Sequence, residues 1–486
     1  MQHVLTPQEA RALDTYMIET LEIPGILLME QAASAVADAA IRQAGGGKIL
    51  VVCGGGNNGG DGWAAARILL TRGYSVQIGY TSLNLPPDAA ANMRFFTHTS
   101  FAHALTEKNA EDFFSAHRDA SVVIDALFGT GLSRVPEGLY AKMIGLINGH
   151  PGYKIAVDIP SGVFGGTGQG DIAVEADETV TFQCPKPGHF LYPGRHNTGR
   201  LTVAPIGIAS GFPMPALFHM DELSLPERTA NSNKGTYGRL HILAGSQGMS
   251  GAAILCARGA IRAGAGITAL FSCSYTVDKL QATVPTALAL PIGDDSSRVR
   301  NASPDALLSH CTAVAAGPGL GNHGDLRGLL SQLAVSPLPK VLDADALNIL
   351  SADVPAFCPG TVLTPHPKEF SRLSGKTVEE ILADPIGTAR AYAAAHGVIL
   401  LLKGATTVVT DGQSTCLVTA GSPAMAKGGS GDVLTGVIGG LLAQGISPFE
   451  AACAGAYLCG KAGEAAAAQL GVYAPSAEDT LQYLRP

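Results

Sequence analysis

Short apolar runs alternate with longer amphipathic runs through the first 200 residues of the chain. The apolar runs are rich in β-branched residues, and they are KILVVC (48–53), SVQIGY (75–80), SVVIDA (121–126), KIAVDI (154–159) and TVTF (179–182). Strands buried on both faces read as continuous apolar runs, and the stretches between these runs have the length of helices. The pattern therefore predicts a mainly parallel sheet with helices on both faces, a Rossmann-like doubly wound α/β domain.

The segment before the first of these runs predicts two helices. Thr6 suits the N-cap of the first helix, with Pro7 at its first helical position. Pro24 and Gly25 interrupt the apolar periodicity. We therefore expect one helix to end before Pro24 and a second helix to follow it.

The alternating pattern stops between residues 205 and 230, where prolines stand at positions 205, 213, 215 and 226. We interpret this stretch as a linker. A second alternating series then follows, and it comprises RLHILAGS (239–246), AVAAGPGLG (313–321), KVLDADALN (340–348), TVLTPHPKEF (361–370), VILLLKGATTVVTDG (398–412) and a glycine-rich helix from about residue 431. The 486 residues are too many for one ordinary hydrophobic core. We predict two α/β domains, 1–215 and 216–486.

Composition narrows the class of function. Apolar residues make up 46% of the chain and charged residues 15%, with 60 glycines and a formal net charge of −8. This balance argues against a disordered chain and against nucleic acid or an anionic membrane as a partner. The nine cysteines form no C-x-x-C pair, and the first residues lack the basic and apolar regions of a signal peptide. We expect free thiols and a cytoplasmic enzyme that acts on small molecules.

The glycine loop GGGNNGGDG (54–62) lies between a predicted strand and a predicted helix, and its glycines satisfy the G-x-G-x-x-G pattern of dinucleotide-cofactor loops. A cofactor loop of this kind requires an Asp or Glu near the end of the second strand, and SVQIGYTSLN has neither. A tight strand-to-helix turn packed by glycines is an alternative. That alternative leaves the two asparagines and Asp61 unexplained, and these polar side chains indicate a pocket.

Two further predicted strands end in acids. Asp125 closes SVVIDA and precedes LFGTGLSR, while Asp158 closes KIAVDI and precedes PSG. In an open parallel sheet, ligands bind beyond the carboxyl ends of the strands. The sequence therefore predicts that these acids and the glycine loop share one polar site.

The motifs GGGNNGGDGWAAAR, DALFGTGL, VDIPSG and PKPGH together resemble the NAD(P)H-hydrate epimerase domain, over residues 1 to about 210. The resemblance implies that the substrate is NADH or NADPH hydrated at C6 of the nicotinamide ring, and that the enzyme interconverts the R and S forms. It also implies a potassium ion held by Asn58, Asp125 and Ser161, which are oxygen donors suited to such a cation. Loss and return of hydroxide, or ring opening and closure, requires proton transfer, for which we select Asp158 with Lys186 as a helper.

The same resemblance implies which residues contact the substrate in this domain. They are Asn57, Asn58, Gly59, Gly60, Asp61, Gly129, Thr130, Gly131, Leu132, Ser133, Arg134, Val135 and Asp158. Backbone N–H groups of the glycine-rich segments would meet the phosphates.

The stretch GSPAMAKGGSGDVLTG (421–436) carries the clearest chemistry of the second domain. Gly431 and Asp432 open a predicted apolar helix, whose N-terminal N–H groups and dipole would face a transferring phosphoryl group. Asp432 would act as a base or orient the attacking hydroxyl. An alternative is an ordinary helix N-terminus with Asp432 as a capping residue. The arrangement resembles the anion hole of the ribokinase-like fold.

The motifs NKGTYG, AAGPGLG, LDADALN, LTPHPKEF and LLKGATTVVTDG occur in the order seen in NAD(P)H-hydrate dehydratases, and this resemblance covers about 230–483. It implies a ribokinase-like α/β domain that dehydrates the S-hydrate, favouring ADP with ATP as a second candidate, and releases AMP and phosphate. Mg²⁺ is expected with the nucleotide. Asn233 departs from the His that related sequences often carry.

The resemblance assigns two sets of contacts in this domain. The hydrate contacts are Ala253, Gly319, His366 and Asp432, and the nucleotide contacts are Lys403, Gly404, Ala405, Thr406, Thr407 and Gly431. His366 stands between two prolines, so a rigid loop residue that binds nothing is an alternative for it.

Two other interpretations stay open. The chain could be a different ribokinase-like enzyme, such as a vitamin-type kinase, fused to an unrelated α/β domain. Alternatively, the first domain could be a regulatory nucleotide-binding module without catalysis. Under each of these interpretations, including the repair enzyme, we expect a homo-oligomer, with a tetramer as the candidate state.

Overall fold

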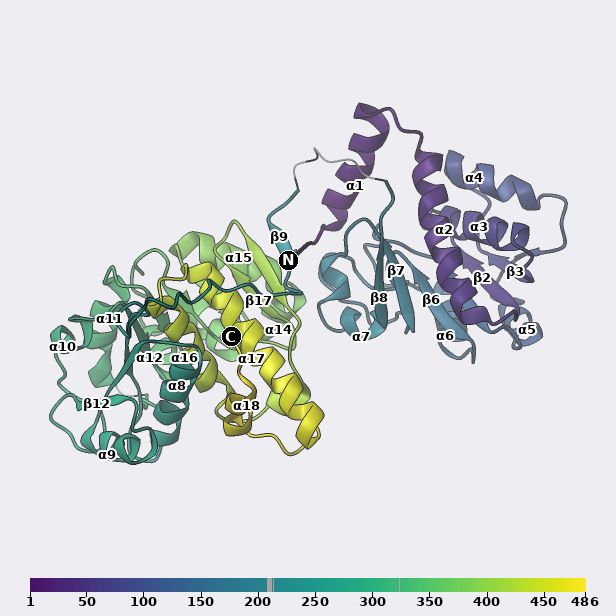
Figure 1. Ribbon diagram of the computed structural model, residues 1–486. Coiled ribbons are helices and arrows are strands. Elements are labelled where there is room, and N and C mark those ends of the chain that lie inside the picture. The colour runs from purple at the N-terminus through teal and green to yellow at the C-terminus, as the bar shows by residue number, and fades with distance from the viewer. Residues whose placement is uncertain (208–211, 213, 323) are drawn as a thin grey trace. The chain divides into compact units, whose positions relative to one another are not determined.

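The computed structural model describes residues 1–207, 212, 214–322 and 324–486. The chain divides into two compact units, Gln2–Pro215 and Ala216–Pro486, the latter together with Met1. We refer to them as the N-terminal unit and the C-terminal unit, and Figure 1 labels their elements. Within the described part of the chain, no helix is long and apolar enough to cross a membrane.

The N-terminal unit is built on a parallel sheet with the strand order β4-β3-β2-β5-β6-β7-β8. The strands of the unit are β1 (Gln2–His3), β2 (Ile49–Cys53), β3 (Val76–Tyr80), β4 (Ala102–Ala104), β5 (Val122–Ala126), β6 (Tyr153–Val157), β7 (Glu178–Phe182) and β8 (Arg200–Ala204). Its helices are α1 (Pro7–Thr15), η1 (Tyr16–Thr20), α2 (Gly25–Ala44), α3 (Asn57–Thr71), α4 (Pro87–Met93), η2 (Arg94–Phe96), α5 (Ala110–Ala116), α6 (Leu139–Asn148), η3 (Pro187–His189) and α7 (Gly194–Thr198). The five strands predicted from the apolar runs are confirmed, and β1, β4 and β8 are additional.

Alternate residues of the central strands pack into two different cores. On one face, Val51 and Ile124 contact helices α2, α3 and α4 through Val36, Trp63 and Ala89. On the other face, neighbouring strand residues pack against α5 and α6. The predicted helix–sheet–helix arrangement is therefore confirmed.

The start of the chain folds as predicted. The Thr6 hydroxyl accepts a hydrogen bond from the Glu9 N–H, the Glu9 carboxylate accepts one from the Thr6 N–H, and Pro7 occupies the first helical turn of α1. The helix continues into η1, a π-helical turn, and α2 begins at Gly25. Both predicted helices are confirmed.

The C-terminal unit is built on a second sheet, whose strand order runs β9-β18-β17-β16-β15-β14-β13-β10-β11-β12. Its strands are β9 (Leu217–His219), β10 (Arg239–Leu243), β11 (Ile267–Ser272), β12 (Leu288–Pro291), β13 (Ala313–Ala316), β14 (Lys340–Leu342), β15 (Val362–Leu363), β16 (Ile399–Leu402), β17 (Thr407–Thr410) and β18 (Thr415–Val418). Its helices are α8 (Ser250–Arg262), α9 (Ser274–Thr283), α10 (Pro304–Leu308), η4 (Gly324–Leu326), α11 (Arg327–Val335), α12 (Ala344–Leu350), α13 (Pro367–Ser374), α14 (Val378–Ala383), α15 (Pro385–His396), η5 (Pro423–Met425), α16 (Ser430–Ala443), α17 (Pro448–Leu470) and α18 (Ala477–Tyr483).

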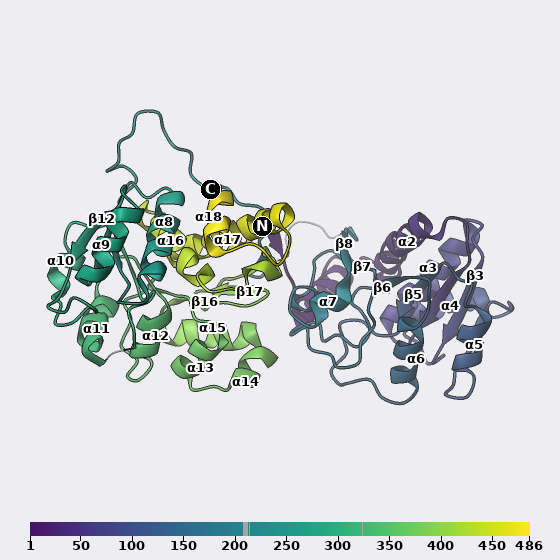
Figure 2. The same cartoon turned by 90° about the horizontal axis from the view of Figure 1, so that it is seen from below.

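Helices cover both faces of this sheet. Figure 2 shows α8, α16, α17 and α18 on one face and α11 to α15 on the other. The first group buries its apolar side chains against strand residues such as Ile242, Ala315 and Leu401. The strands of this unit pair in parallel except in the β16–β17 and β17–β18 pairs, which are antiparallel. The predicted α/β class is thus confirmed for both units.

Several details differ from the sequence pattern, which did not include β11, β12 and β18. The apolar run 398–412 folds as the hairpin β16–β17, because Lys403 to Thr406 turn the chain back on itself. The predicted linker contains β9, which pairs in parallel with β18. Residues 208–211 and 213 of that linker lie outside the described residues. Each of the nine cysteines is a free thiol, as expected.

Candidate active sites

A cavity of about 690 Å³ lies at the carboxyl edge of the N-terminal sheet. It is lined by the loop after β2 and the first turn of α3, by the loop after β5, by Asp158 directly after β6, and by Lys186 after β7. Strands β2, β5, β6 and β7 are neighbours, so their carboxyl ends meet at one place. Asp158 and the glycine loop selected from the sequence are therefore brought together at this cavity, whereas Asp125 is not part of its lining.

The glycines of the first loop serve packing more than ligand contact. A Cβ at Gly54 would lie 2.0 Å from the carbonyl oxygen of Leu127, and a Cβ at Gly59 would lie 2.0 Å from that of Gly54. Gly56, in contrast, has open space where its Cβ would be, and it lines the cavity. The G-x-G-x-x-G spacing therefore reflects close backbone packing around a polar pocket.

Asp158 and Lys186 form an ion pair at the cavity wall. Lys186 Nζ lies 2.5 Å from Asp158 Oδ1, and their side chains are 4% and 14% exposed respectively. The Thr181 hydroxyl also donates to Asp158 Oδ1, over 2.9 Å. Burial raises the pKa of Asp158, but the Lys186 ammonium and these hydrogen bonds outweigh burial, and the net pKa is lowered. The carboxylate is thereby held in its ionised form.

The backbone at Asp158 is held in an uncommon conformation. Its φ angle is 65°, which is strained for a residue with a side chain. His189 Nδ1 accepts from the Lys186 N–H over 3.0 Å, so the Nε2–H of His189 donates to the Asp158 carbonyl over 2.9 Å. Burial, together with the charge of Lys186, lowers the pKa of His189 to about 4. A neutral histidine therefore fixes the backbone that carries the ion pair.

Two other acids of the same cavity have raised pKa values. Burial raises the pKa of Asp61 well above its usual value, and the charges of Asp158 and Asp14 add to this effect. Burial raises the pKa of Asp14 to about 6, again with a contribution from Asp158, while Lys186 opposes both shifts. The cavity therefore holds one ionised carboxylate beside two that bind protons readily.

Below the cavity, Asp125 and Ser161 form a buried polar cluster. The Ser161 hydroxyl and N–H donate to Asp125 over 2.6 and 2.8 Å, and the Phe128 N–H donates to the Ser161 hydroxyl. Burial raises the pKa of Asp125 to about 6, although the hydrogen bonds from Ser161 and Leu127 lower it. Among the described residues, no cationic side chain pairs with Asp125, and the buried Asn58 Nδ2 has no hydrogen-bond partner.

The other predicted residues of this domain fall into two groups. Asn57, Asn58, Asp61, Gly129 to Arg134, Asp158 and Lys186 line the cavity. Gly59 and Gly60 are buried under it in α3, and Val135 is an exposed residue outside the lining. The prediction missed Arg11 and Asp14, two cavity-lining residues of α1.

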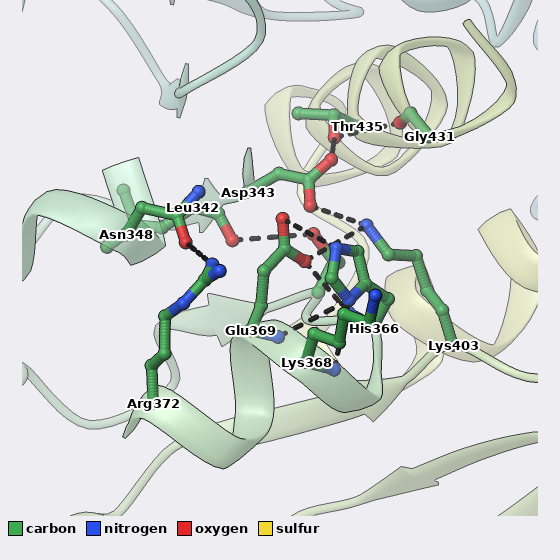
Figure 3. A network of polar contacts seen from close by, with 11 residues as sticks. Leu342, Asp343, Asn348, His366, Lys368, Glu369, Arg372, Lys403, Gly431 and Thr435 are labelled. Atoms are coloured by element: carbon green, nitrogen blue, oxygen red, sulfur yellow. Dashed lines mark hydrogen bonds and ion pairs between the residues drawn. The ribbon is translucent and has the colours of Figure 1, made fainter. Parts of the chain in front are cut away.

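In the C-terminal unit, a second buried ion pair lies at the carboxyl edge of the sheet (Figure 3). Asp343 follows β14 and Lys403 follows β16, and Lys403 Nζ lies 2.7 Å from Asp343 Oδ1. The Thr435 hydroxyl, from α16, donates to Asp343 Oδ2 over 2.7 Å. Burial lowers the pKa of Lys403, but the charges of Asp343 and Glu369 outweigh it and raise the net value.

His366 and Glu369 extend this network at the start of α13. His366 Nδ1 accepts from the N–H groups of Lys368 and Glu369, and the Glu369 carboxylate accepts from the His366 N–H over 2.9 Å. His366 Nε2 lies 3.4 Å from Glu369 Oε1. The other carboxylate oxygen of Glu369, Oε2, lies 3.8 Å from Lys403 Nζ. His366 is therefore the N-cap of α13, and its contact with the hydrate stays a prediction.

The N-terminus of α16 meets the ion pair. A Cβ at Gly431 would lie 3.5 Å from Lys403 Nζ and 3.6 Å from Asp343 Oδ2. Burial and the charge of Asp343 raise the pKa of the adjacent Asp432 to about 6, with Lys403 opposing. Three features therefore lie close together: the first turn of the 14-residue helix α16, the ammonium group of Lys403, and the carboxyl group of Asp432 with its raised pKa. Such a place suits an anion beside a group that loses its proton.

The remaining predicted residues of this unit are placed as follows. Ala253 is buried in α8, and Gly319 has a φ angle of 63° and packs on the start of that helix, where its Cβ would lie 2.8 Å from the Met249 carbonyl oxygen. Lys403, Gly404, Ala405 and Thr406 form the turn between β16 and β17, and Thr407 is the first residue of β17. Asn233 forms a turn in which its side chain accepts from the Gly235 N–H. Sequence reasoning quoted the motifs around Asp343 and Glu369 but missed both residues.

The two units match two different protein families. Residues 26–188 match the YjeF-related protein N-terminus, and residues 240–484 match the NAD(P)H-hydrate dehydratase family.

Similar proteins carry both parts in one chain. A bifunctional NAD(P)H-hydrate repair enzyme of Moorella thermoacetica is 37% identical over 99% of this chain and 96% of its own length. A relative of the same name in Escherichia coli is 35% identical over 87% of this chain and 82% of its own. The C-terminal unit is also similar to a crystal structure of the ADP/ATP-dependent NAD(P)H-hydrate dehydratase from Bacillus subtilis, which was co-crystallized with ATP and Mg²⁺. The two sequences are 31% identical, the match covers 54% of this chain and 92% of the Bacillus chain, and the TM-score is 0.49. The near-complete coverage by the first relative shows that the chain belongs to the family of bifunctional NAD(P)H-hydrate repair enzymes.

Proposed function

We propose that the N-terminal unit interconverts the R and S forms of NADH and NADPH hydrate, and that the C-terminal unit dehydrates the S form with a nucleotide, ADP being favoured. The observation that carries this proposal is the presence of two separately built polar sites, one in each family-matched part of the chain. We propose that the boundary between the two activities lies between residues 215 and 216.

The sequence assigned proton transfer to Asp158 with Lys186, but because Lys186 holds Asp158 ionised, we assign to this pair the stabilisation of positive charge during the reaction. Loss of the C6 hydroxyl leaves positive charge on the nicotinamide ring, and an ionised Asp158 in a half-enclosed cavity stabilises that charge. Lys186 holds the carboxylate ionised and in place. The backbone N–H groups of Gly129 to Arg134 line the cavity and can donate to the substrate phosphates.

Potassium fits the cluster below this cavity. Asp125, Ser161 and Asn58 offer carboxylate, hydroxyl and amide oxygens, and the buried Asp125 lacks a cationic partner among the described side chains. A Cβ at Gly129 would lie 3.1 Å from Asn58 Oδ1, so Asn58 stands beside the loop that contacts Ser161. A bound cation would neutralise Asp125 and hold the three loops together.

In the C-terminal site, Asp432 takes the proton from the C6 hydroxyl as that oxygen attacks the terminal phosphoryl group of the nucleotide. The N–H groups of the first turn of α16, together with Lys403, stabilise the negative charge of the transferring group. Asp343 and Thr435 hold Lys403 at that helix end. The C6–O bond then breaks as the ring nitrogen supplies electrons and phosphate leaves, and loss of the proton at C5 restores the dihydronicotinamide ring.

Mg²⁺ suits this site as a companion of the nucleotide. Within the described ranges, no group of three or more acidic, histidine or cysteine side chains could hold a metal. Mg²⁺ usually keeps several waters and binds through substrate phosphates. It would neutralise phosphate charge during transfer, while Asp343 and Glu369 are already engaged by Lys403.

The test is recovery of the absorbance of NADH at 340 nm from its purified hydrates. With S-hydrate and ADP or ATP, the chain should restore the absorbance and release free phosphate. With R-hydrate, recovery should also require the N-terminal unit and potassium. A kinase of another kind would instead accumulate a phosphorylated product, and a purely regulatory N-terminal unit would leave the R form unused.

Two predictions about the whole protein stay open to simple measurements. Light scattering at several concentrations tests the predicted homo-oligomer. Fractionation of the source cells tests the predicted cytoplasmic location.

A further inference from the structure

The proposed epimerase reaction needs a proton donor. The bond between C6 and its oxygen breaks as the ring nitrogen pushes electrons toward C6, and the oxygen leaves as water only if it gains a proton. Water then adds to the opposite face of the flat cation and releases one proton. No net proton is consumed, but a group must supply the first one.

Four carboxyl groups line the cavity, and they are Asp14, Asp61, Asp88 and Asp158. Asp158 is held ionised by Lys186. Asp88 lies against the start of α2, where a Cβ at Gly25 would come within 2.6 Å of its Oδ2 atom. Asp61 is half-buried in the second turn of α3. Asp14 differs because its side chain is exposed to the cavity, whereas those of Asp61 and Asp88 are half-buried and that of Asp158 is paired with Lys186; among the described residues, Asp14 makes no hydrogen bond or ion pair.

The position of Asp14 on helix α1 places its side chain at the cavity. Arg11, Asp14 and Ile18 follow one another at helical spacing, and all three line the cavity. The start of the helix is seated on the rest of the unit, since a Cβ at Gly165 would lie 3.0 Å from Pro7 Cγ. The capping box at Thr6 fixes one end of α1, and the π-helical turn η1 follows directly after Thr15. Turns of this kind recur at functional sites.

The surroundings of Asp14 favour exchange of a proton near neutral pH. Protein half-encloses the cavity, and burial raises the pKa of Asp14 to about 6 even though its side chain can reach solvent. The charge of Asp158 adds to the shift and Lys186 opposes it. An acid with such a pKa exists in both forms at physiological pH, which suits proton transfer.

We infer that Asp14 is the proton-transfer residue of the epimerase site, a role that rests on the proposed function of the N-terminal unit. Its carboxyl group donates a proton to the C6 oxygen as the C–O bond breaks and water leaves. The water that adds to the other face of the ring gives its proton to solvent, and Asp14 regains a proton from solvent. Helix α1 lies before residues 26–188, which match the family model. The proposed site therefore includes a helix that the matched part of the chain does not contain.

The test uses the full chain without nucleotide and purified R-hydrate of NADH, with the S form separated by chromatography. Asp14→Asn should lower kcat about 100-fold or more, the range of a lost general acid, and change KM less than about threefold. Asp14→Glu should recover part of the rate. Glu19→Gln is the matched control, because Glu19 is an exposed acid of η1 outside the cavity, and it should match the wild type.

A pH profile separates proton transfer from a structural role. In the wild type, kcat/KM should fall as pH rises through the pKa of Asp14, and Asp14→Asn should lose this limb. The other charged or titratable groups of the cavity remain in that variant, and they are Arg11, Asp61, Asp88, Arg134, Tyr140, Asp158 and Lys186. Loss of the limb is therefore due to Asp14.

Each outcome decides something. If the wild type leaves the R form unchanged, the proposed epimerase function is wrong. If the wild type converts it and Asp14→Asn matches it in rate and pH profile, the role of Asp14 is overturned. The role is also overturned if Asp14→Asn raises KM with kcat unchanged, or if Asp14→Glu is no faster. Near-ultraviolet circular dichroism of both variants shows whether the N-terminal unit is folded.

Discussion

The two units use a similar ion pair in different surroundings. In each, an aspartate directly follows a parallel strand and pairs with a lysine that follows a nearby strand, Asp158 with Lys186 and Asp343 with Lys403. In the N-terminal unit the neighbours of the pair are the acids Asp14 and Asp61. In the C-terminal unit the neighbours are the N-terminus of α16, which carries Asp432, and the acid Glu369.

Acids stand beside both pairs, so the helix N-terminus is the difference that adds phosphoryl chemistry to proton transfer in the C-terminal unit. Additional acids around a carboxylate raise each other's pKa and make a site that exchanges protons. A helix N-terminus beside a lysine attracts an anion and stabilises charge on a transferring group. The same paired residues therefore support two reactions because of what the folds place next to them.

The largest expected effect tests whether the two sites work separately. Asp432→Asn should lower kcat of S-hydrate dehydration about 10²–10⁴-fold, the range for loss of a general base, because the hydroxyl loses its proton acceptor. It should leave conversion of R to S unchanged. Asp158→Asn should do the reverse. The two rates are measured on the same preparations, by absorbance at 340 nm and by chromatography.

Calorimetry of the same variants shows whether each unit still unfolds as in the wild type. Removal of one partner of a buried pair costs about 3–5 kcal/mol, so Asp158→Asn requires this control. Comparable losses in both reactions from either single variant would show that the sites are not separate.

A smaller effect is expected in the pH dependence of dehydration. Burial and Asp343 raise the pKa of Asp432 to about 6, and the base must be ionised to act. The rate should therefore rise about fourfold between pH 5.5 and 8. Asp343→Asn removes a negative charge that raises this pKa, so the acid limb of the profile should move to lower pH. A limb that stays in place or moves to higher pH would contradict the assigned role of Asp432.

Most of the fold was predictable because buried parallel strands are apolar throughout. The two strands of the N-terminal sheet that were missed, β4 and β8, are its edges. Edge strands expose one side, and β8 alternates polar and apolar residues over Arg200–Ala204. Short strands of that kind lack the continuous apolar signal.

Site residues that directly follow strands were predictable from the sequence. Site residues whose place depends on the orientation of a helix, or on a pairing between distant residues, were not. Asp158 could be selected because the carboxyl ends of neighbouring strands meet. Asp14 could not be, because the face that α1 presents to the cavity depends on contacts with residues far along the chain, such as Gly165. The pairing of Asp343 with Lys403 likewise joins strands separated by 60 residues.

Potassium binding offers a test of the N-terminal site that does not depend on activity. At a tenfold excess over Kd, potassium should stabilise the N-terminal unit by about 1.4 kcal/mol, because the ion binds only the folded cluster. Calorimetry should show Tm rising about 3–6 °C. Choline chloride at equal ionic strength is the control, and Asp125→Asn should abolish the difference. An equal rise in choline chloride would exclude a specific site.

The smallest effect concerns how α1 is held. Thr6→Ala removes the hydroxyl of its capping box and should cost about 1 kcal/mol, while Thr6→Ser should cost little. Thr377→Ala is the matched variant in the C-terminal unit, since Thr377 forms the same capping box with Glu380 at the start of α14. Each loss is measured by calorimetry as a lower Tm of the affected unit.

The two variants should differ in activity although their stability losses are alike. Because α1 carries Arg11 and Asp14 into the cavity, loosening its start should slow R-to-S conversion a few-fold. Thr377→Ala should leave both reactions unchanged, since none of the site contacts described above involves α14. If Thr6→Ala costs stability without slowing epimerisation, α1 is a structural cover and the acids of the strand ends carry the reaction without it.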